Sequence, residues 1–122
     1  MSDIQNRQDI EVLIRAFYKK VLADDLIAHF FIDAVQVDWK KHFPTMIDFW
    51  EGVIFEKPTY KGNAMLKHVD LHKLSPLKKE HFDRWLELFS ETIDEQFSGQ
   101  KAEMAKQRAL SIATVIQLKT YS

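Results

Sequence analysis

The sequence contains no cysteine, and this absence removes several kinds of chemistry at once. Without thiols the chain can form no disulfide, no thiolate zinc site, no iron–sulfur cluster and no thiol nucleophile. Glycine is also scarce, and Gly52, Gly62 and Gly99 stand too far apart to form a phosphate-binding loop for a flavin or nicotinamide. None of the serines has the Gly-x-Ser-x-Gly context of a hydrolase nucleophile.

The chain also has no excess of charge and no long apolar run. Seventeen basic and eighteen acidic residues nearly cancel, which argues against nucleic acid, an anionic membrane or a polyanion as the partner. No apolar run approaches the roughly 20 residues that span a bilayer, and the polar N-terminus is unlike a signal peptide. We therefore expect a cytoplasmic protein, a monomer, with a small molecule as its partner.

Aromatic residues, by contrast, are plentiful. Nine Phe and three Trp occur in 122 residues, and 46% of the chain is hydrophobic. This is enough apolar material for one core, so we predict a single domain over residues 1–122.

The apolar residues follow helical spacing in most of the chain. Apolar positions three and four apart predict a helix over residues 9–23, one or two turns over 24–31, and a helix over 38–55. Pro44 belongs in a first turn, so we expect the regular helix to begin near His42 or Phe43.

Proline, glycine and serine residues mark the boundaries of the helices in the second half of the chain. A loop over 57–62 leads to a short helix over 63–71; Ser75-Pro76 predicts the start of a helix that runs to Phe97; and a last helix covers 100–119. No segment has the alternation of a strand, so the predicted fold class is all-α.

Tyr18, His42, His68 and Trp85 follow one another along these predicted helices, and this order resembles that of the truncated haemoglobins. The segments that carry the resemblance, which extends from Ile10 to about Leu118, are Phe17-Tyr18, His42 with Phe49-Trp50 after it, Leu66-Lys-His68-x-Asp70-Leu71, and Phe82-x-x-Trp85-Leu-x-Leu-Phe89. The Gly-Gly pairs of other groups are missing, so the third group fits best. The resemblance implies a two-over-two helical sandwich that encloses haem b, held non-covalently because there is no Cys-x-x-Cys-His.

His68 matches the proximal iron ligand of that family. His72 lies four residues later on the same helix face and is the fallback ligand. The pair also permits another interpretation, a zinc or other metal-binding helical protein that uses His68 and His72 with His81 or Asp70. A cofactor-free helical adaptor is a third possibility.

Three further residues match the distal, ligand-facing side of the family's pocket. Tyr18 matches a tyrosine whose hydroxyl donates to a polarised ligand, and Trp85 matches a tryptophan whose indole N–H can do the same. His42 matches a distal histidine, which can donate to the ligand, gate its entry or bind iron itself. Without the resemblance, Tyr18 and Trp85 would be taken as ordinary core residues.

Phe31, Met46 and Trp50 complete the candidate cofactor-binding set. Phe31 matches the phenylalanine that wedges the haem plane. Met46 would line the same wall as His42, and Trp50 is expected to pack along the haem edge or under the long helix. Aromatic and Met residues at helical spacing are more often plain core, so these last two are weaker candidates.

The resemblance implies binding of dioxygen, nitric oxide or carbon monoxide. Redox turnover, such as nitric oxide dioxygenation or a peroxidase-like reaction, is a further possibility. It would need a partner reductase, because the chain has no flavin or nicotinamide motif.

Overall fold

The computed structural model describes residues 1–32, 38–57, 68, 71–72 and 76–120. All regular structure within these residues is helical, in agreement with the predicted fold class. The elements are α1 (Arg7–Leu22), α2 (His29–Ile32), α3 (Trp39–Phe55), α5 (Lys79–Gln96) and α6 (Gln100–Thr120). None of the helices in this described part is both long and apolar enough to cross a bilayer.

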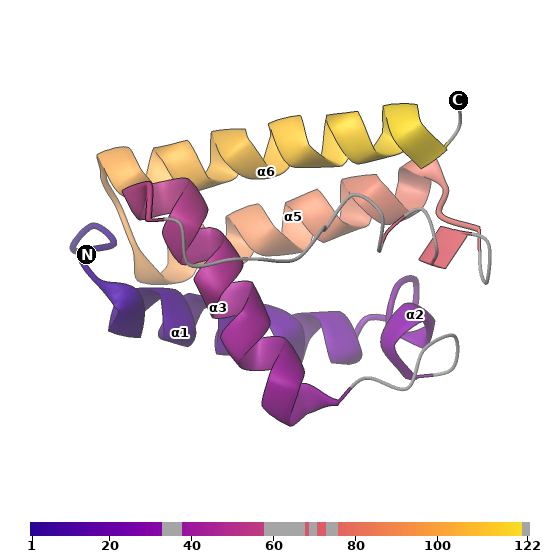
Figure 1. Ribbon diagram of the computed structural model, residues 1–122, viewed down its shortest axis with the longest axis horizontal. Helices are drawn as coiled ribbons and strands as arrows, with labels where there is room; N and C mark the ends of the chain where they lie inside the picture. The colour runs from indigo at the N-terminus through magenta and orange to yellow at the C-terminus, as the bar shows by residue number, and fades with distance from the viewer. Residues whose placement is uncertain (33–37, 58–67, 69–70, 73–75, 121–122) are drawn as a thin grey trace.

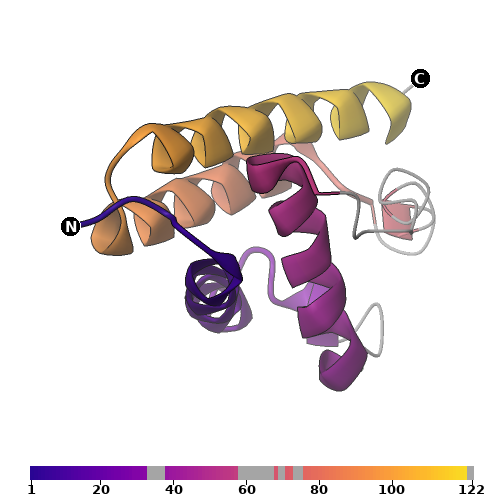
Figure 2. The ribbon, with the colours of Figure 1, turned by 60° about the vertical axis from the view of Figure 1, so that its left-hand side comes forward.

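The long helices form two stacked pairs. α5 and α6 run side by side as one layer, and α3 crosses in front of α1 as the other (Figure 1). Seen from the side, α1 appears end-on beneath the α5–α6 layer while α3 stands beside it (Figure 2). Contacts of α1 with α5 and of α3 with α6 join the layers. This is the two-over-two sandwich that the family resemblance implied.

α1 forms because its apolar residues share one face and its first turn is capped. The Asn6 side chain accepts a hydrogen bond from the Asp9 backbone N–H at 3.0 Å, which satisfies one of the unpaired donors at the helix start. Seven apolar residues of this helix have helical spacing, and six of them are buried, namely Ile10, Leu13, Ile14, Phe17, Tyr18 and Val21. Leu22, the seventh, is half-buried.

α6 packs closely on its neighbours because its inner face is built from alanines. Ala102, Ala105, Ala109 and Ala113 are buried there together with Ile116, while Ile112 is half-buried. Small side chains let two helix backbones approach, and α6 contacts α5 more extensively than it contacts α3 in the part of the chain that the structure describes.

The predicted range of 38–55 for α3 is confirmed, but the expectation that its regular part begins near His42 or Phe43 was wrong. Pro44 lies inside the helix, which begins at Trp39 and has Asp38 as its N-cap. The Asp38 carboxylate accepts a backbone N–H two residues later at 3.1 Å, and its carbonyl accepts the His42 N–H at 2.8 Å. Proline removes only one N–H from the ladder, and the cap with the packed aromatic first turn offsets that loss.

The predicted start of α5 was also wrong. The helix begins at Lys79, three residues after Pro76, which is exposed and non-helical. The cap comes from within the helix, because Nδ1 of His81 accepts the backbone N–H of Lys78 at 2.9 Å. Ser75, the predicted capping hydroxyl, lies outside the described residues.

The N-terminal arm caps α6. The Asp3 carboxylate accepts the backbone N–H groups of Lys101 and Ala102 at 2.8 and 2.9 Å, and Ile4 is buried behind it. Gly99 precedes the helix with φ 147°, and a Cβ there would lie 2.5 Å from the Asp3 side chain. Glycine is therefore required for both its conformation and its size.

Most of the predicted loop over 57–62 and the short helix over 63–71 falls outside the described residues. Within that stretch His68 and Leu71 are helical, as is His72 just beyond it.

Candidate functional site

Tyr18 lies at the centre of an aromatic cluster where α1, α2 and α3 meet. Its side chain is only 6% exposed. Phe31 from α2 and Trp39 from α3 contact it edge-on, with ring centroids 5.6 and 5.5 Å away. Burial raises the pKa of Tyr18 above its usual value, because the phenolate would lose its hydration. The hydroxyl therefore stays protonated and can act as a hydrogen-bond donor.

His42 approaches Tyr18 from α3. The two ring centroids are 5.0 Å apart, and the planes meet at 75°. Its Nε2 atom is buried in the protein. Trp39, one turn earlier on the same helix, packs edge-on against the imidazole at 5.2 Å and helps to fix the ring. The structure thus brings together two of the three predicted distal residues.

Trp85, the third distal candidate, is linked to Tyr18 through Phe17. The Trp85 ring meets Phe17 edge-to-face at 5.5 Å, and Phe17 lies 5.2 Å from the Tyr18 ring. On its other side Trp85 stacks on Phe89 at 5.4 Å, with the planes 3° from parallel. The indole is half-buried. It therefore belongs to the same aromatic wall without touching Tyr18 through a ring contact.

Met46 and Trp50, the two weaker candidates on α3, differ in their burial. Met46 is half-buried one turn after His42. Trp50 is only 3% exposed and stacks on Phe89 of α5 at 4.7 Å. The contact is typical of a core residue that packs under the long helix, which is one of the two positions that we expected for it.

An apolar groove of about 420 Å³ lies between α3 and α6. Phe49 forms part of its wall and also contacts Trp50 edge-on at 5.5 Å. Trp50 in turn stacks on Phe89, so the groove adjoins the aromatic residues of α5. The lining residues are Phe49, Val53, Arg108, Ser111, Ile112, Val115 and Ile116.

His68 and His72, the two alternatives for the proximal ligand, are both helical and half-buried. His72 already has a structural role, because its Nδ1 accepts the backbone N–H of Leu77 at 2.9 Å. An imidazole that accepts through Nδ1 carries its proton on Nε2, so ligation of iron through Nε2 of His72 would require the other tautomer.

His81, the third residue of the alternative metal site, points toward α2. Its ring lies 4.8 Å from Phe30 and 5.9 Å from His29. Among the residues that the structure describes, no three His, Asp or Glu side chains come close enough to hold a metal ion. Asp70, the other donor considered, lies outside those residues.

Trp39 and Phe43 are members of the Tyr18 cluster that the sequence did not single out. Phe43 contacts Tyr18 at 5.9 Å and Trp39 at 5.2 Å. Their spacing around His42 was visible in the sequence. It gave no reason to prefer them over other aromatic residues at helical spacing.

The residues present fit a haem group. A flat macrocycle needs apolar aromatic walls, and a polarised gas ligand needs protonated donors in a dry place. The cluster supplies both: aromatic rings on three helices, and the buried Tyr18 hydroxyl beside His42. His68 offers an imidazole of the kind that holds haem iron.

The comparisons with known proteins agree with this geometry. Residues 2–117 match the family model described as "Bacterial-like globin". A group 3 truncated haemoglobin from Campylobacter jejuni is 31% identical over 95% of this chain and 91% of its own length. A group 1 truncated haemoglobin from Tetrahymena pyriformis is 31% identical over 70% of this chain and 66% of its own length.

A solved structure gives the same result. The crystal structure of a group III truncated haemoglobin from Campylobacter jejuni superimposes with a TM-score of 0.84 at 32% identity, covering 100% of this chain and 97% of that one.

The fold and the aromatic site therefore define a small haem-binding globin. The chain belongs to the bacterial-like globin family, and within it to group III of the truncated haemoglobins. Membership implies a haem cofactor and the binding of diatomic gases such as dioxygen.

Proposed function

We propose that this globin holds haem b non-covalently through His68 and binds dioxygen, nitric oxide and carbon monoxide. Haem iron supplies the open coordination position that these gases need. Tyr18 and Trp85 are the proposed hydrogen-bond donors to the ligand, with His42 beside them. We further propose that the protein acts as a monomer in the cytoplasm.

The observation that carries the proposal is the burial of Tyr18 against His42. A phenol hydroxyl in a dry aromatic cluster, with its pKa raised by burial, is a fixed neutral donor. A bound dioxygen carries partial negative charge, and a hydrogen bond to such an oxygen contributes on the order of 1.5–3 kcal/mol. This favours the retention of a polarised ligand over its rapid release.

The roles of the other cluster residues follow from their contacts. Phe31 and Trp39 hold the Tyr18 ring edge-on, so its hydroxyl has little freedom. Phe17 sits between Tyr18 and Trp85 and fixes the separation of the two donors. Donors that are already oriented lose little entropy when a ligand arrives.

Turnover of nitric oxide or peroxide is a second proposal that depends on the first. Such a reaction consumes electrons, and the sequence has no flavin or nicotinamide motif to supply them. We propose that a separate reductase provides them. Tight retention of a polarised ligand suits such turnover better than it suits oxygen transport, which needs rapid release.

Spectroscopy after hemin reconstitution tests the proposal. Absorption spectra of the wild type, His68→Ala and His72→Ala are recorded in ferric, dithionite-reduced and carbon monoxide-bound forms. His72→Ala is the matched control, because it removes another half-buried imidazole only four residues away. We expect the Soret band to be lost or shifted only in His68→Ala.

Other results would change the assignment in defined ways. If only His72→Ala lost the band, the proximal ligand would lie one helical turn later. If the wild type bound no hemin, the proposed function would be wrong for this chain, and analysis for zinc would follow.

A further inference from the structure

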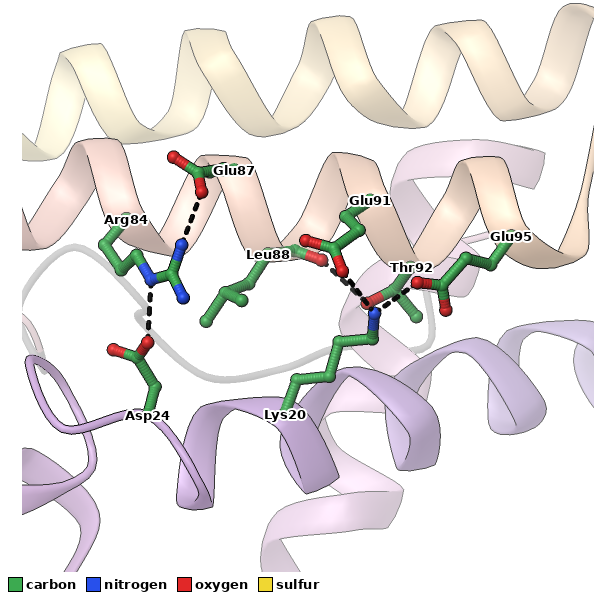
Figure 3. Close-up of polar contacts among 8 residues, drawn as sticks. All are labelled: Lys20, Asp24, Arg84, Glu87, Leu88, Glu91, Thr92 and Glu95. Carbon is green, nitrogen blue, oxygen red and sulfur yellow. Dashed lines mark hydrogen bonds and ion pairs between the residues drawn. The ribbon is translucent and has the colours of Figure 1, made fainter.

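Two sets of ion pairs join α5 to α1 and to the turn that follows α1 (Figure 3). Lys20 near the end of α1 lies 2.9 Å from Glu91 and also contacts Glu95. Arg84 donates from Nε at 2.7 Å to Asp24, which lies four residues after Lys20 and just beyond the end of α1. The Lys20 link joins side chains alone, whereas the Asp24 carboxylate also holds the backbone of the turn that follows α1.

Asp24 organises the turn between α1 and α2. Its Oδ2 atom accepts the backbone N–H groups of Leu26 and Ile27 at 3.2 and 3.3 Å, while Oδ1 accepts from Arg84. The Asp24 side chain is only 8% exposed. A nearly buried carboxylate that accepts from three donors is held in one orientation. It therefore fixes the position of the turn relative to Arg84 on α5.

The turn leads directly to Phe31, which contacts the Tyr18 ring. Backbone hydrogen bonds from Ala28 to Asp24 and from Phe31 to Ala28 continue the turn into α2 without a break. Phe31 then meets Tyr18 at 5.6 Å and His42 at 6.4 Å. A change in the Asp24 turn would therefore reach the cluster around Tyr18.

Arg84 immediately precedes Trp85 on α5. A rotation or shift of α5 at this position moves the Trp85 indole relative to Phe17, its edge-to-face neighbour. The Arg84–Asp24 bond thus connects the residue before one proposed donor with the turn that supports the other.

We propose that Arg84 and Asp24 are positioning residues, whose ion pair sets the placement of the Trp85 indole and of Phe31 around Tyr18. Neither residue takes part in the ring contacts of the cluster. Their effect on a bound gas rests on the proposed function, whereas their effect on the position of Trp85 does not.

Lys20 provides a matched control. It also links the α1 segment with α5 through carboxylates, and its partners Glu91 and Glu95 are about half exposed. Its side chain is bonded to neither the Asp24 turn nor Trp85, and its carbonyl, which accepts the Ala23 N–H, is unchanged by substitution of the side chain. Lys20→Gln and Arg84→Gln therefore remove comparable charges from the same interface, and only the second disturbs the proposed link.

Fluorine NMR of the haem-free protein labelled with fluorotryptophan measures the first effect. The Trp85 resonance is assigned by its loss in Trp85→Phe. We expect Arg84→Gln to move this resonance by more than its linewidth and Lys20→Gln to leave it in place. Arg84→Lys keeps the charge but not the directed Nε–H, so it should give an intermediate shift.

The carbon monoxide stretching frequency of the reconstituted protein measures the second effect, because it responds to the donors around the ligand. We expect a shift in Arg84→Gln, a smaller one in Arg84→Lys and none in Lys20→Gln.

The inference is overturned if Arg84→Gln leaves both signals at their wild-type values, or if Lys20→Gln moves them equally. If Arg84→Gln does not fold, a wild-type Trp85 resonance in Arg84→Lys overturns it. If the wild type binds no hemin, the proposed function fails, and the Trp85 resonance of the haem-free protein alone decides whether the ion pair positions that side chain.

Discussion

The Tyr18 and His42 rings meet edge-to-face across the α1–α3 contact, with centroids 5.0 Å apart. The positively polarised edge of one ring faces the negative face of the other in this geometry. The packing brings two polar side chains from different helices to one dry place, which ordinary core residues would not need. Several consequences of this arrangement can be measured.

Replacement of Tyr18 by Phe should speed the escape of dioxygen by roughly tenfold to a hundredfold. The substitution removes a hydrogen bond of on the order of 1.5–3 kcal/mol and keeps the ring. Because the edge-on contacts with Phe31 and Trp39 remain, the melting temperature should change little. Stopped-flow displacement of dioxygen by carbon monoxide measures the off-rate. An unchanged off-rate would remove Tyr18 from the ligand site.

Trp50 and Trp85 should respond in opposite ways to substitution. Trp50 is buried against Phe89, so Trp50→Ala should cost about 3–5 kcal/mol of stability. Trp50→Phe should alter stability and leave the dioxygen off-rate unchanged. Trp85→Phe, by contrast, should raise that off-rate at modest cost in stability, since its ring is half-buried. Urea unfolding and ligand kinetics on the two Phe variants form a paired test, and equal effects on both measurements would contradict the distinction.

The helical fold could be predicted from the sequence because helical periodicity and aromatic content act locally. The buried stripe of α1 and the inner alanines of α6 follow directly from spacing. The start of α5 could not be predicted, because Ser75-Pro76 is a strong local signal and the actual cap is His81, inside the helix. The sequence could not reveal that His81 would face Phe30.

The candidate site could be predicted only in part, because contacts between helices leave no local pattern in the sequence. Tyr18, His42 and Trp85 stood out through a family resemblance, and their proximity depends on how α1, α3 and α5 cross. The link between Arg84 and Asp24 spans 60 residues of sequence. No periodicity indicates such a contact, since both residues look like surface charges in an amphipathic pattern.

His81 should make the protein less stable as the pH falls below neutrality. Burial is the main cause that lowers the pKa of His81, with the nearby charges of His29 and Lys78 acting in the same direction and Glu80 in the opposite one. The folded state therefore prefers the neutral ring, whose Nδ1 accepts the Lys78 N–H. The stabilisation that the neutral His81 ring gives the folded state is complete above the unfolded-state pKa of about 6.5. It is lost as the pH falls from there toward the lower pKa of His81 in the folded state.

The measurement is a series of urea-unfolding curves between pH 5 and 8. His81→Gln is the control, because its amide oxygen can still cap the helix and does not titrate. The pH dependence should be weaker in this variant. An identical dependence in wild type and His81→Gln would assign it to other groups.

Asp3 should be a stability determinant despite its place near the start of the chain. Desolvation raises its pKa, but hydrogen bonds from Lys101, Ala102 and Ile4 outweigh that and leave the pKa lower than usual. The carboxylate therefore stabilises the fold above its unfolded pKa, and this contribution is lost as the pH falls through the lower folded value. Asp3→Ala should cost about 1–2 kcal/mol, as helix caps do. Urea unfolding measures the loss, and Ser2→Ala, whose backbone carbonyl accepts from Ser98, should be neutral.

Removal of haem should lower the melting temperature. A ligand that binds only the native state adds RT ln(1 + [L]/Kd) to stability, so tight binding contributes several kcal/mol. The effect should be uneven along the chain, because the α5–α6 and N-terminal contacts depend on alanine packing and on the Asp3 cap. The Tyr18 cluster would instead face the cofactor. Hydrogen exchange of the haem-free and reconstituted proteins should therefore show the largest gain in protection in α2 and the first turns of α3, with little change in the first turns of α6. Equal melting temperatures, or a uniform gain in protection, would contradict a haem site at this cluster.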